Sequence, residues 1–427
     1  MRWLSRLGSA ARPAVYVLAG DGARPRARNL ALDPRLERVA SPRHADILLV
    51  VGALPEDVRA EAAAVHDQVP PPRGVVEWGG DGAALGPWAD AVPVAAEDDP
   101  VPVVMWLQRA LFRGERPSSE PIGPAENPVP WKGLGPHGQG GEGMMGGTPY
   151  GRPMAMTAED VRDGLQLDCV TVPLGPFLPW MPPGLRVDVD LQGDVVQALR
   201  PVVSETVKPD VPEPFVRALH DEVPVAEIEV ARARHHLHAT ADLLWLHHLD
   251  ALAVRALRVA CALTSGGAEP VRRLERALRR TGALRLATRG VGRLSEDETA
   301  GLGPTARAAG RAEDARLGDP AYEGLGFEVR TGRRGDTQAR WQQRLVEAAQ
   351  ALELAARAGD RRREPGPPLE GPRGTCPPGA TTRSLELLRE RAVGRTFDRL
   401  VTTLVGLDLD PGSVPHPRRP AEEGPHA

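Results

Sequence analysis

The chain has 427 residues, and at roughly 150 residues per domain this length predicts two or three domains. Its 53 basic residues nearly balance its 57 acidic residues, which gives a formal net charge of −4. This balance lacks the excess of positive charge that is typical of nucleic-acid-binding proteins, so no nucleic acid is expected as a partner. The three cysteines, Cys169, Cys261 and Cys376, are far apart in the sequence, which indicates neither a disulfide framework nor a thiolate metal site.

No apolar run of the sequence approaches the roughly 18 residues that a membrane-spanning helix needs. The apolar run at 14–19 is too short for a secretory signal, and the scarcity of cysteine fits a reducing compartment. We therefore expect a cytoplasmic protein with no membrane span of its own, which reaches a membrane only through a partner.

The first part of the sequence alternates short apolar runs with a helical pattern that begins at Pro55. The apolar runs are AVYVLAG at 14–20, ADILLVVG at 45–52 and RGVVEWGG at 73–80. Such strands, separated by helices, are typical of a parallel sheet covered on both faces, so residues 10–115 are predicted to form an α/β domain. Ligands of these sheets bind beyond the carboxyl ends of the strands, where the loops are expected to converge. These loops are residues 20–23, 52–54 and 79–83.

Residues 116–150 are predicted to be a linker, because they lie in a stretch so dense in proline and glycine that neither a helix nor a central strand can form. A second domain is predicted over 151–415, followed by a disordered tail at 416–427. The second domain opens with the strand-like stretches LQLDCVTVPLG and GLRVDVDLQGDVV. In the latter, apolar and charged residues alternate with the period of two of a half-exposed antiparallel strand.

From Ala226 onward the apolar residues recur at helical spacing. One or two long helices are expected over 226–263, another over 269–280, and a third over 336–359 that ends at Gly359. The second domain is therefore predicted to be mainly α, an α+β domain with a β hairpin at its start.

Four segments of the second domain carry recognisable patterns. The longest, from Gly301 to Glu347, contains an ordered series of glycine, proline, arginine and acidic positions; the others are GPFLPWMPPGLRVDVDLQGDVV at 175–196, EVARARHHL at 229–237 and VTTLVGLDLDPGSV at 401–414. Together they resemble the quinone-binding large subunit of respiratory NADH dehydrogenase (complex I) and the large subunits of membrane-bound nickel-iron hydrogenases. The resemblance implies the large-subunit fold for this domain.

The first domain contains SPRHADILLVVGALP, VHDQVPPPRGVVEWGG and DAVPVAAEDDPVPV. These stretches resemble the small subunit of the same complexes, which holds the last iron-sulfur cluster before quinone. The resemblance implies a flavodoxin-like fold and a chain that combines both subunits. It further implies partner subunits, an integral membrane subunit among them, and a peripheral position on the inner face of the plasma membrane.

The ligands of the family's redox centres are missing from the sequence. An iron-sulfur cluster requires four thiolates, and residues 1–168 contain no cysteine. Leu178 and Pro183 stand where the family has two histidines near the quinone headgroup, and 401–414 lacks the cysteine pair of a nickel site. The iron-sulfur cluster and the nickel-iron centre are therefore expected to be absent, no cofactor is expected to bind directly, and quinone stays open as a ligand. The stretch AGDGARPR at 19–26 lacks the third glycine of a dinucleotide loop, so no NAD-binding motif is present.

Charged residues of the matching segments are candidates for a charge network beneath the family's quinone cavity. The candidates are Arg232, His236, Arg307, Asp314, Arg316, Asp336 and Arg340. If the network is buried, Asp314 and Asp336 each require an arginine partner. The alternative is a set of surface ion pairs on loops. No catalytic residue is predicted.

Histidines are concentrated between His235 and His248. On one helix His235, His238 and Asp242 share a face, and these side chains suit zinc or ferrous iron. Ligands from a single helix rarely complete a coordination sphere. The alternative is that His236 fills a structural position of the family and that the other histidines are solvated.

The leading hypothesis is a subunit of a complex I-like or hydrogenase-like membrane oxidoreductase that is structural or forms a divergent quinone site, without catalytic activity of its own. One alternative is a free-standing soluble binding or regulatory protein, which predicts polar exposed faces around the helical region. A second alternative is a metal-dependent enzyme that uses the histidines from His235 to His248.

Overall fold

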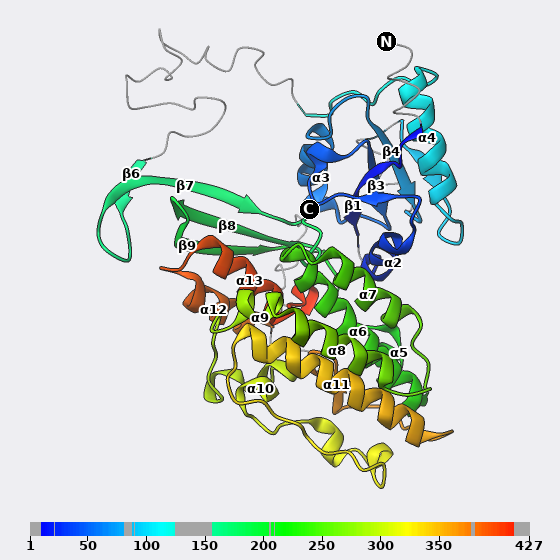
Figure 1. The fold of residues 1–427 in the computed structure, drawn as a ribbon, viewed down its shortest axis with the longest axis vertical. Coiled ribbons are helices and arrows are strands. Elements are labelled where there is room, and N and C mark those ends of the chain that lie inside the picture. The colour runs from blue at the N-terminus through cyan, green and yellow to red at the C-terminus, as the bar shows by residue number, and fades with distance from the viewer. Residues whose placement is uncertain are drawn as a thin grey trace, which may run out of the picture.

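The computed structural model describes residues 10–20, 22–80, 88, 90–123, 156–204, 206–208, 210–376 and 381–413. It contains an α/β domain and a mainly helical domain that carries a long sheet on one side (Figure 1). The predicted disordered tail and most of the predicted linker lie outside the described residues.

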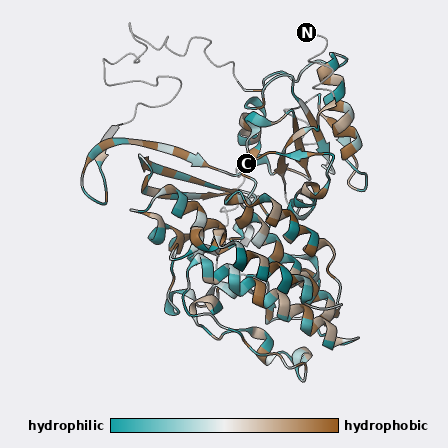
Figure 2. Ribbon diagram, in the orientation of Figure 1, coloured by the Kyte–Doolittle hydropathy of each residue, from teal (hydrophilic) through white to brown (hydrophobic). Residues whose placement is uncertain are grey.

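The first domain is built on a parallel sheet of five strands in the order β2-β1-β3-β4-β5, which confirms the predicted parallel sheet. The strands are β1 (Ala14–Ala19), β2 (Glu37–Arg38), β3 (Ile47–Val51), β4 (Gly74–Trp78) and β5 (Val92–Val94), and the helices are α2 (Arg24–Asn29), α3 (Arg59–Asp67) and α4 (Val101–Arg113). Helix α3 packs on one face, and α2 and α4 pack on the other. The strands between these layers are largely hydrophobic (Figure 2), because both of their faces are buried.

This domain extends beyond its predicted boundary at residue 115. Ser119 is buried, its backbone N–H donates to the Arg73 carbonyl at 2.9 Å, and its Oγ lies 3.1 Å from Nε2 of His66. Residues 116–123, which were predicted to begin the linker, are therefore packed against the α/β domain.

The second domain begins with an antiparallel sheet in which neighbouring strands follow one another in the chain. Its strands are β6 (Met156–Glu159), β7 (Gln166–Leu174), β8 (Leu185–Gln192) and β9 (Val195–Val203). Leu185, Val187 and Val189 are fully buried, as their alternation predicts. Strand β7 projects away from the helices (Figure 1), and nearly all of its residues are exposed.

The rest of the second domain is helical, and the predicted long stretch over 226–263 forms two helices. The helices are α5 (Glu213–Arg217), α6 (Val225–Leu246), α7 (Asp250–Cys261), α8 (Glu269–Thr281), α9 (Ala283–Thr288), α10 (Pro304–Ala309), α11 (Thr337–Ala358), α12 (Thr381–Ala392) and α13 (Phe397–Leu407). Short strand pairs join β10 (Val223–Pro224) to β11 (Arg362–Arg363) and β12 (Leu369–Gly371) to β13 (Gly374–Cys376). Helices α6 and α11 pack against each other at the centre, where most of their residues are buried.

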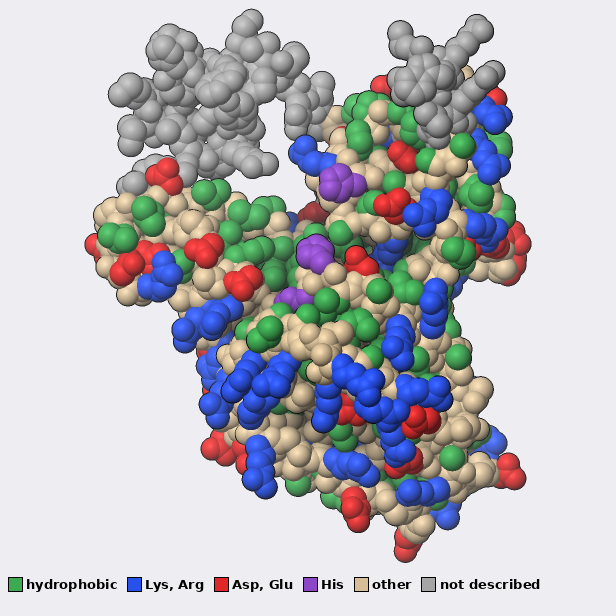
Figure 3. Space-filling model, viewed as in Figure 1, with side chains coloured by type: hydrophobic (Ala, Val, Ile, Leu, Met, Phe, Trp, Pro, Cys, Tyr) green, Lys and Arg blue, Asp and Glu red, His purple; other side chains and the backbone are tan. Residues whose placement is uncertain are grey.

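None of the helices in the described part of the chain has both the length and the apolar character that crossing a membrane requires. Figure 3 shows that arginine side chains gather on one face of the helical domain, over α8, α9 and α12. The near-zero net charge therefore does not reflect an even distribution of charge.

Candidate functional site

A network of charged side chains lies in the interior of the helical domain and joins α6, α10, α11 and β12. Arg307 of α10 donates to both carboxylate oxygens of Glu347 of α11, at 2.7 and 2.8 Å, and to Glu370 of β12 at 2.8 Å. Its Nη1 also lies 3.1 Å from Asp314. Each of these four side chains is at most 3% exposed. Four separate parts of the chain therefore meet at one guanidinium.

The same network continues to α6 through a second arginine. Arg316 donates to both oxygens of Asp314, at 2.9 and 2.7 Å, and to Glu229 at 3.1 Å. Glu229 also accepts from Arg232 at 3.1 Å and from the Tyr322 hydroxyl at 2.6 Å. The candidates Arg232, Arg307, Asp314 and Arg316 therefore belong to one buried network, and the alternative of surface ion pairs does not describe them.

The electrostatics of this network favour its charged form. Burial alone raises the pKa of Glu347, but the Arg307 guanidinium outweighs this effect and holds the pKa at about 2. Burial and the neighbouring Glu229 carboxylate raise the pKa of Tyr322 well above its usual value. The tyrosine therefore stays protonated and donates its hydrogen bond to Glu229.

His236 lies beside this network without joining it through a hydrogen bond. Its Nε2 lies 3.6 Å from Glu347, and both of its ring nitrogens are buried without a hydrogen-bond partner. Burial lowers its pKa well below 6.5, so the ring is neutral. His236 therefore acts as a buried packing residue against α11.

Asp336 and Arg340 lie at the start of α11, away from the network. Asp336 accepts from the backbone N–H of Ala339 at 2.7 Å and of Gly290 at 2.9 Å. A buried Asp336 was expected to have an arginine partner; Arg334 forms this pair at a distance of 4.0 Å, with 44% of its side chain exposed, and the closer contacts come from backbone amides. Arg340 donates to the carbonyls of Gly406, Gly292 and Gly335. Both side chains stabilise the backbone here.

The three candidate metal ligands on α6 point to different partners. Nε2 of His235 lies 2.7 Å from Oδ2 of Asp408, whereas Asp242 pairs with Arg24 and Arg28 of the first domain. His238 is buried. Within the described residues, no group of three or more side chains could hold a metal ion. The expectation that His235 and His238 are solvated was wrong, because both side chains are buried.

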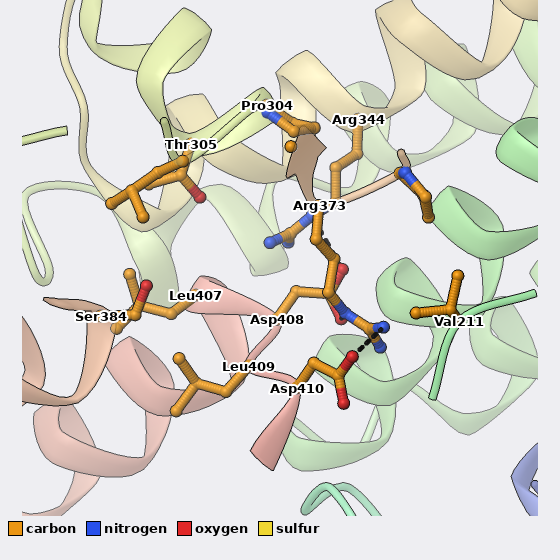
Figure 4. Close-up of a pocket in the computed structure, with 13 residues that line it drawn as sticks. Val211, Pro304, Thr305, Arg344, Arg373, Ser384, Leu407, Asp408, Leu409 and Asp410 are labelled. Atoms are coloured by element: carbon orange, nitrogen blue, oxygen red, sulfur yellow. Dashed lines mark hydrogen bonds and ion pairs between the residues drawn. The ribbon is translucent and has the colours of Figure 1, made fainter. Parts of the chain in front are cut away.

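A cavity with about 630 Å³ of empty volume, its mouth included, lies where α10, α11 and the end of α13 meet (Figure 4). Its walls combine apolar residues with two arginines and two aspartates: Val211, Leu302, Pro304, Thr305, Arg344, Pro372, Arg373, Gly374, Ser384, Leu407, Asp408, Leu409 and Asp410. Arg344 and Arg373 extend into the hollow from α11 and from the loop between β12 and β13.

Asp408 is the centre of the polar wall of this cavity. It accepts from Arg373 at 3.3 Å, pairs with His235, and lies 3.9 Å from Arg344. Burial raises the pKa of Asp408, but Arg373 and His235 outweigh it and hold the pKa well below 3.8. Arg344 donates through Nη2 to the Gly406 carbonyl at 2.7 Å, while its buried Nη1 has no partner. The cavity thus offers one unused donor on a mostly apolar wall.

The two domains are joined by ion pairs between α2 and α6. Arg24 donates to Asp242 of α6 at 2.8 Å, and Arg28 donates to the same carboxylate through Nε at 3.1 Å and through Nη2. All three side chains are less than 10% exposed. The Tyr16 hydroxyl of β1 adds a bond of 2.8 Å to the Phe177 carbonyl, in the loop between β7 and β8. Sequence reasoning missed this contact.

Residues 258–396 match the family of the 49 Kd subunit of respiratory-chain NADH dehydrogenase. A segment of the chain is 36% identical over 110 residues to a subunit of an NADH-quinone oxidoreductase of Chloroflexus aurantiacus, covering 24% of this chain and 27% of that protein. The chain thus matches about a quarter of the length of this relative. Both matches support a relationship to the complex I large-subunit family, and the family match lies within the second domain.

The chain aligns with one chain in a solved structure of the membrane-bound sulfane sulfur reductase (MBS), an archaeal respiratory membrane complex. The alignment covers 58% of this chain and 98% of that chain. The TM-score is 0.41 and the sequence identity is 17%. Neither value is high enough to carry an argument about function.

The family match covers most of the charged network. Arg307, Asp314, Arg316, Glu347 and Glu370 all lie within residues 258–396. The first domain offers no thiolate for an iron-sulfur cluster, because the sequence has no cysteine before Cys169. Such a cluster needs four thiolates.

Proposed function

We propose that this chain is a subunit of a membrane oxidoreductase of the complex I type, in which it serves as a structural or divergent quinone-site component. The observation that carries the proposal is the family match over residues 258–396 together with the buried network centred on Arg307 in the same segment. We further propose that the first domain is related to the small subunit of these complexes and that the chain lies on the inner face of the plasma membrane. The strand order 2-1-3-4-5 of the first domain supports a flavodoxin-like fold.

The exposed strand β7 favours a role within a complex over a free-standing soluble protein. Leu167, Val170 and Val172 are exposed on it, with Val161 and Leu165 in the turn before it. Because successive residues of a strand point to opposite faces, apolar side chains are exposed on both faces of β7. A free-standing protein is expected to avoid such a surface, whereas a neighbouring protein in a complex would cover it.

The test is purification of the tagged chain from detergent-solubilised membranes of its native host. We expect an integral membrane protein to co-purify with it, and we expect Val170→Glu to weaken that association at least tenfold. The matched control is Leu286→Glu, which adds the same charge at an exposed leucine of α9. A chain found only as a soluble monomer, for the wild type and both variants, would contradict the proposal.

The cavity between α10, α11 and α13 supports quinone as a ligand. Its apolar walls suit a hydrophobic ring, and the unused Nη1 of Arg344 suits a carbonyl oxygen. We expect a water-soluble quinone to raise the melting temperature of the purified chain in a saturable way, and Arg344→Gln to weaken this binding. The purified protein should show no iron-sulfur signal in its absorption and spin-resonance spectra.

A further inference from the structure

A second cavity lies between the two domains, beside the carboxyl end of β1. It has about 370 Å³ of empty volume, the open solvent at its mouth included. On one side it is lined by Val17 and Ala19 of β1 and by three arginines, and on the other by apolar residues of the loop at 176–183. The arginines are Arg24 and Arg28 of α2 and Arg38 of β2.

The cavity lies at the carboxyl end of β1, on the side of α2 and β2. Strand β1 pairs with β2 on one side and with β3 on the other, and helices α2 and α3 cover opposite faces. The connections of the chain therefore reverse direction between β1 and β3, where open parallel sheets form binding crevices, and the cavity lies next to this point.

The charges that line the cavity do not balance. Asp242 is the carboxylate that pairs with Arg24 and Arg28, and it is shared between them. Arg38 forms no ion pair in the described structure: its guanidinium stands 4.3 Å over the ring of Trp245, and its Nη2 lies 3.5 Å from the Pro179 carbonyl. The Nη1 of Arg38 is buried and has no hydrogen-bond partner.

The environment of Arg38 shows the same imbalance. Burial lowers the pKa of Arg38 to about 10, and the charges of Arg28 and Arg24 add to this effect against the opposing charge of Asp242. Buried charges are stable only when a partner of opposite charge accompanies them. Asp210 also opposes the charges of Arg24 and Arg28, so Arg38 is the arginine of this cavity that lacks an ion pair of its own in the described structure.

We propose that this cavity binds a small oxoanion of the phosphate or sulfate class, held by Arg38 together with Arg24 and Arg28. Guanidinium groups match the geometry of such anions because two parallel N–H groups can donate to two oxygens. The anion supplies the missing negative charge and lies between the two domains. The proposal rests on the charges of this boundary and is independent of which complex the chain joins.

The test uses the full-length chain and inorganic phosphate, added at constant ionic strength against sodium chloride. Isothermal titration and thermal unfolding should both show saturable binding to the wild type, and Arg38→Gln should bind at least tenfold more weakly. The matched control is Arg43→Gln in the same domain, because Arg43 is exposed; it should bind as the wild type does. Sulfate should compete with phosphate.

The variant Arg38→Gln also separates anion binding from a purely structural role. Without phosphate, this variant should be at least as stable as the wild type, because it removes a buried charge that forms no ion pair in the described structure. If Arg38 served only to pack on Trp245, the variant would be less stable with and without phosphate alike. Such a loss of stability would overturn the proposal. So would equal phosphate affinity of the variant and the wild type, or the absence of saturable phosphate binding to the wild type.

Discussion

Glu347 illustrates how a single carboxylate holds the helical domain together. Both of its oxygens accept from Arg307, and Nε2 of Gln343 donates to it at 2.8 Å. Removing one partner of a buried ion pair leaves the other charge without compensation, which costs more than the pair itself contributes. The Arg307 guanidinium would keep Glu370 and Asp314 as its carboxylate partners and would still donate to the Glu313 carbonyl.

We therefore expect Glu347→Gln to lower the free energy of unfolding by about 3–5 kcal/mol. The pKa of Glu347 is lowered by folding to about 2, so its contribution is complete above the usual glutamate pKa and is lost as the pH falls from about 4.5 toward 2. Urea unfolding at several pH values measures both effects. As the pH falls through this range, the free energy of unfolding should decrease less for the variant than for the wild type. Parallel decreases in the two proteins would contradict this assignment.

The exposed pair Glu213 and Arg217 of α5 provides the control for this experiment. Its two side chains are 67% and 36% exposed and 3.3 Å apart. Exposed pairs contribute little because water screens them, so Glu213→Gln should leave the unfolding curve nearly unchanged.

At the scale of elements, helix α11 depends on the residue that precedes it. Asp336 accepts from two backbone N–H groups, one from the first turn of the helix and one from Gly290. Side-chain acceptors at this position satisfy amide groups that have no partner within the helix.

We expect Asp336→Ala to destabilise the protein by about 0.5–2 kcal/mol, because an alanine cannot accept these bonds. Asp336→Asn keeps an oxygen acceptor and should cost much less. The measurement is the urea midpoint of both variants. An equal loss in the two would show that the charge of Asp336, rather than its hydrogen bonds, stabilises α11.

The sequence predicted the elements well where one local pattern decides them. The alternation of Leu185, Val187 and Val189 predicted β8, and helical spacing predicted α11 almost to its ends. It failed where the partner lies far along the chain. Arg307 and Glu370 are 63 residues apart, and Arg24 and Asp242 are 218 residues apart, so no spacing could reveal these pairs.

A few of the missed contacts did have a local signal. Glu229 and Arg232 are three residues apart on α6 and face each other, as that spacing allows. Arg24 and Arg28 are four residues apart, directly after a strand of the parallel sheet. Their partner remained unknown because it lies in the other domain.

At the scale of the whole molecule, Asp242 is one of the residues that link the two domains electrostatically, and Glu61 of α3, which pairs with Arg186 of β8 at 2.8 Å, is another. Asp242→Asn would leave Arg24 and Arg28 facing each other without a carboxylate between them. We expect faster hydrogen exchange in α2 and in the loop at 176–183, with little change in α8. Asp221→Asn, at an exposed aspartate, is the control. Unchanged exchange in α2 would show that other contacts suffice to hold the domains together.

Both domains belong to a single polypeptide, and this has a consequence for how tightly they must bind each other. Segments that are tethered meet at an effective concentration that reaches the millimolar range, far above that of separate proteins in a cell. A contact that depends on a few ion pairs and hydrogen bonds, such as those of Asp242 with Arg24 and Arg28 and of Arg186 with Glu61, can therefore persist. Synthesis also delivers the two halves in equal number, so neither can accumulate without its counterpart.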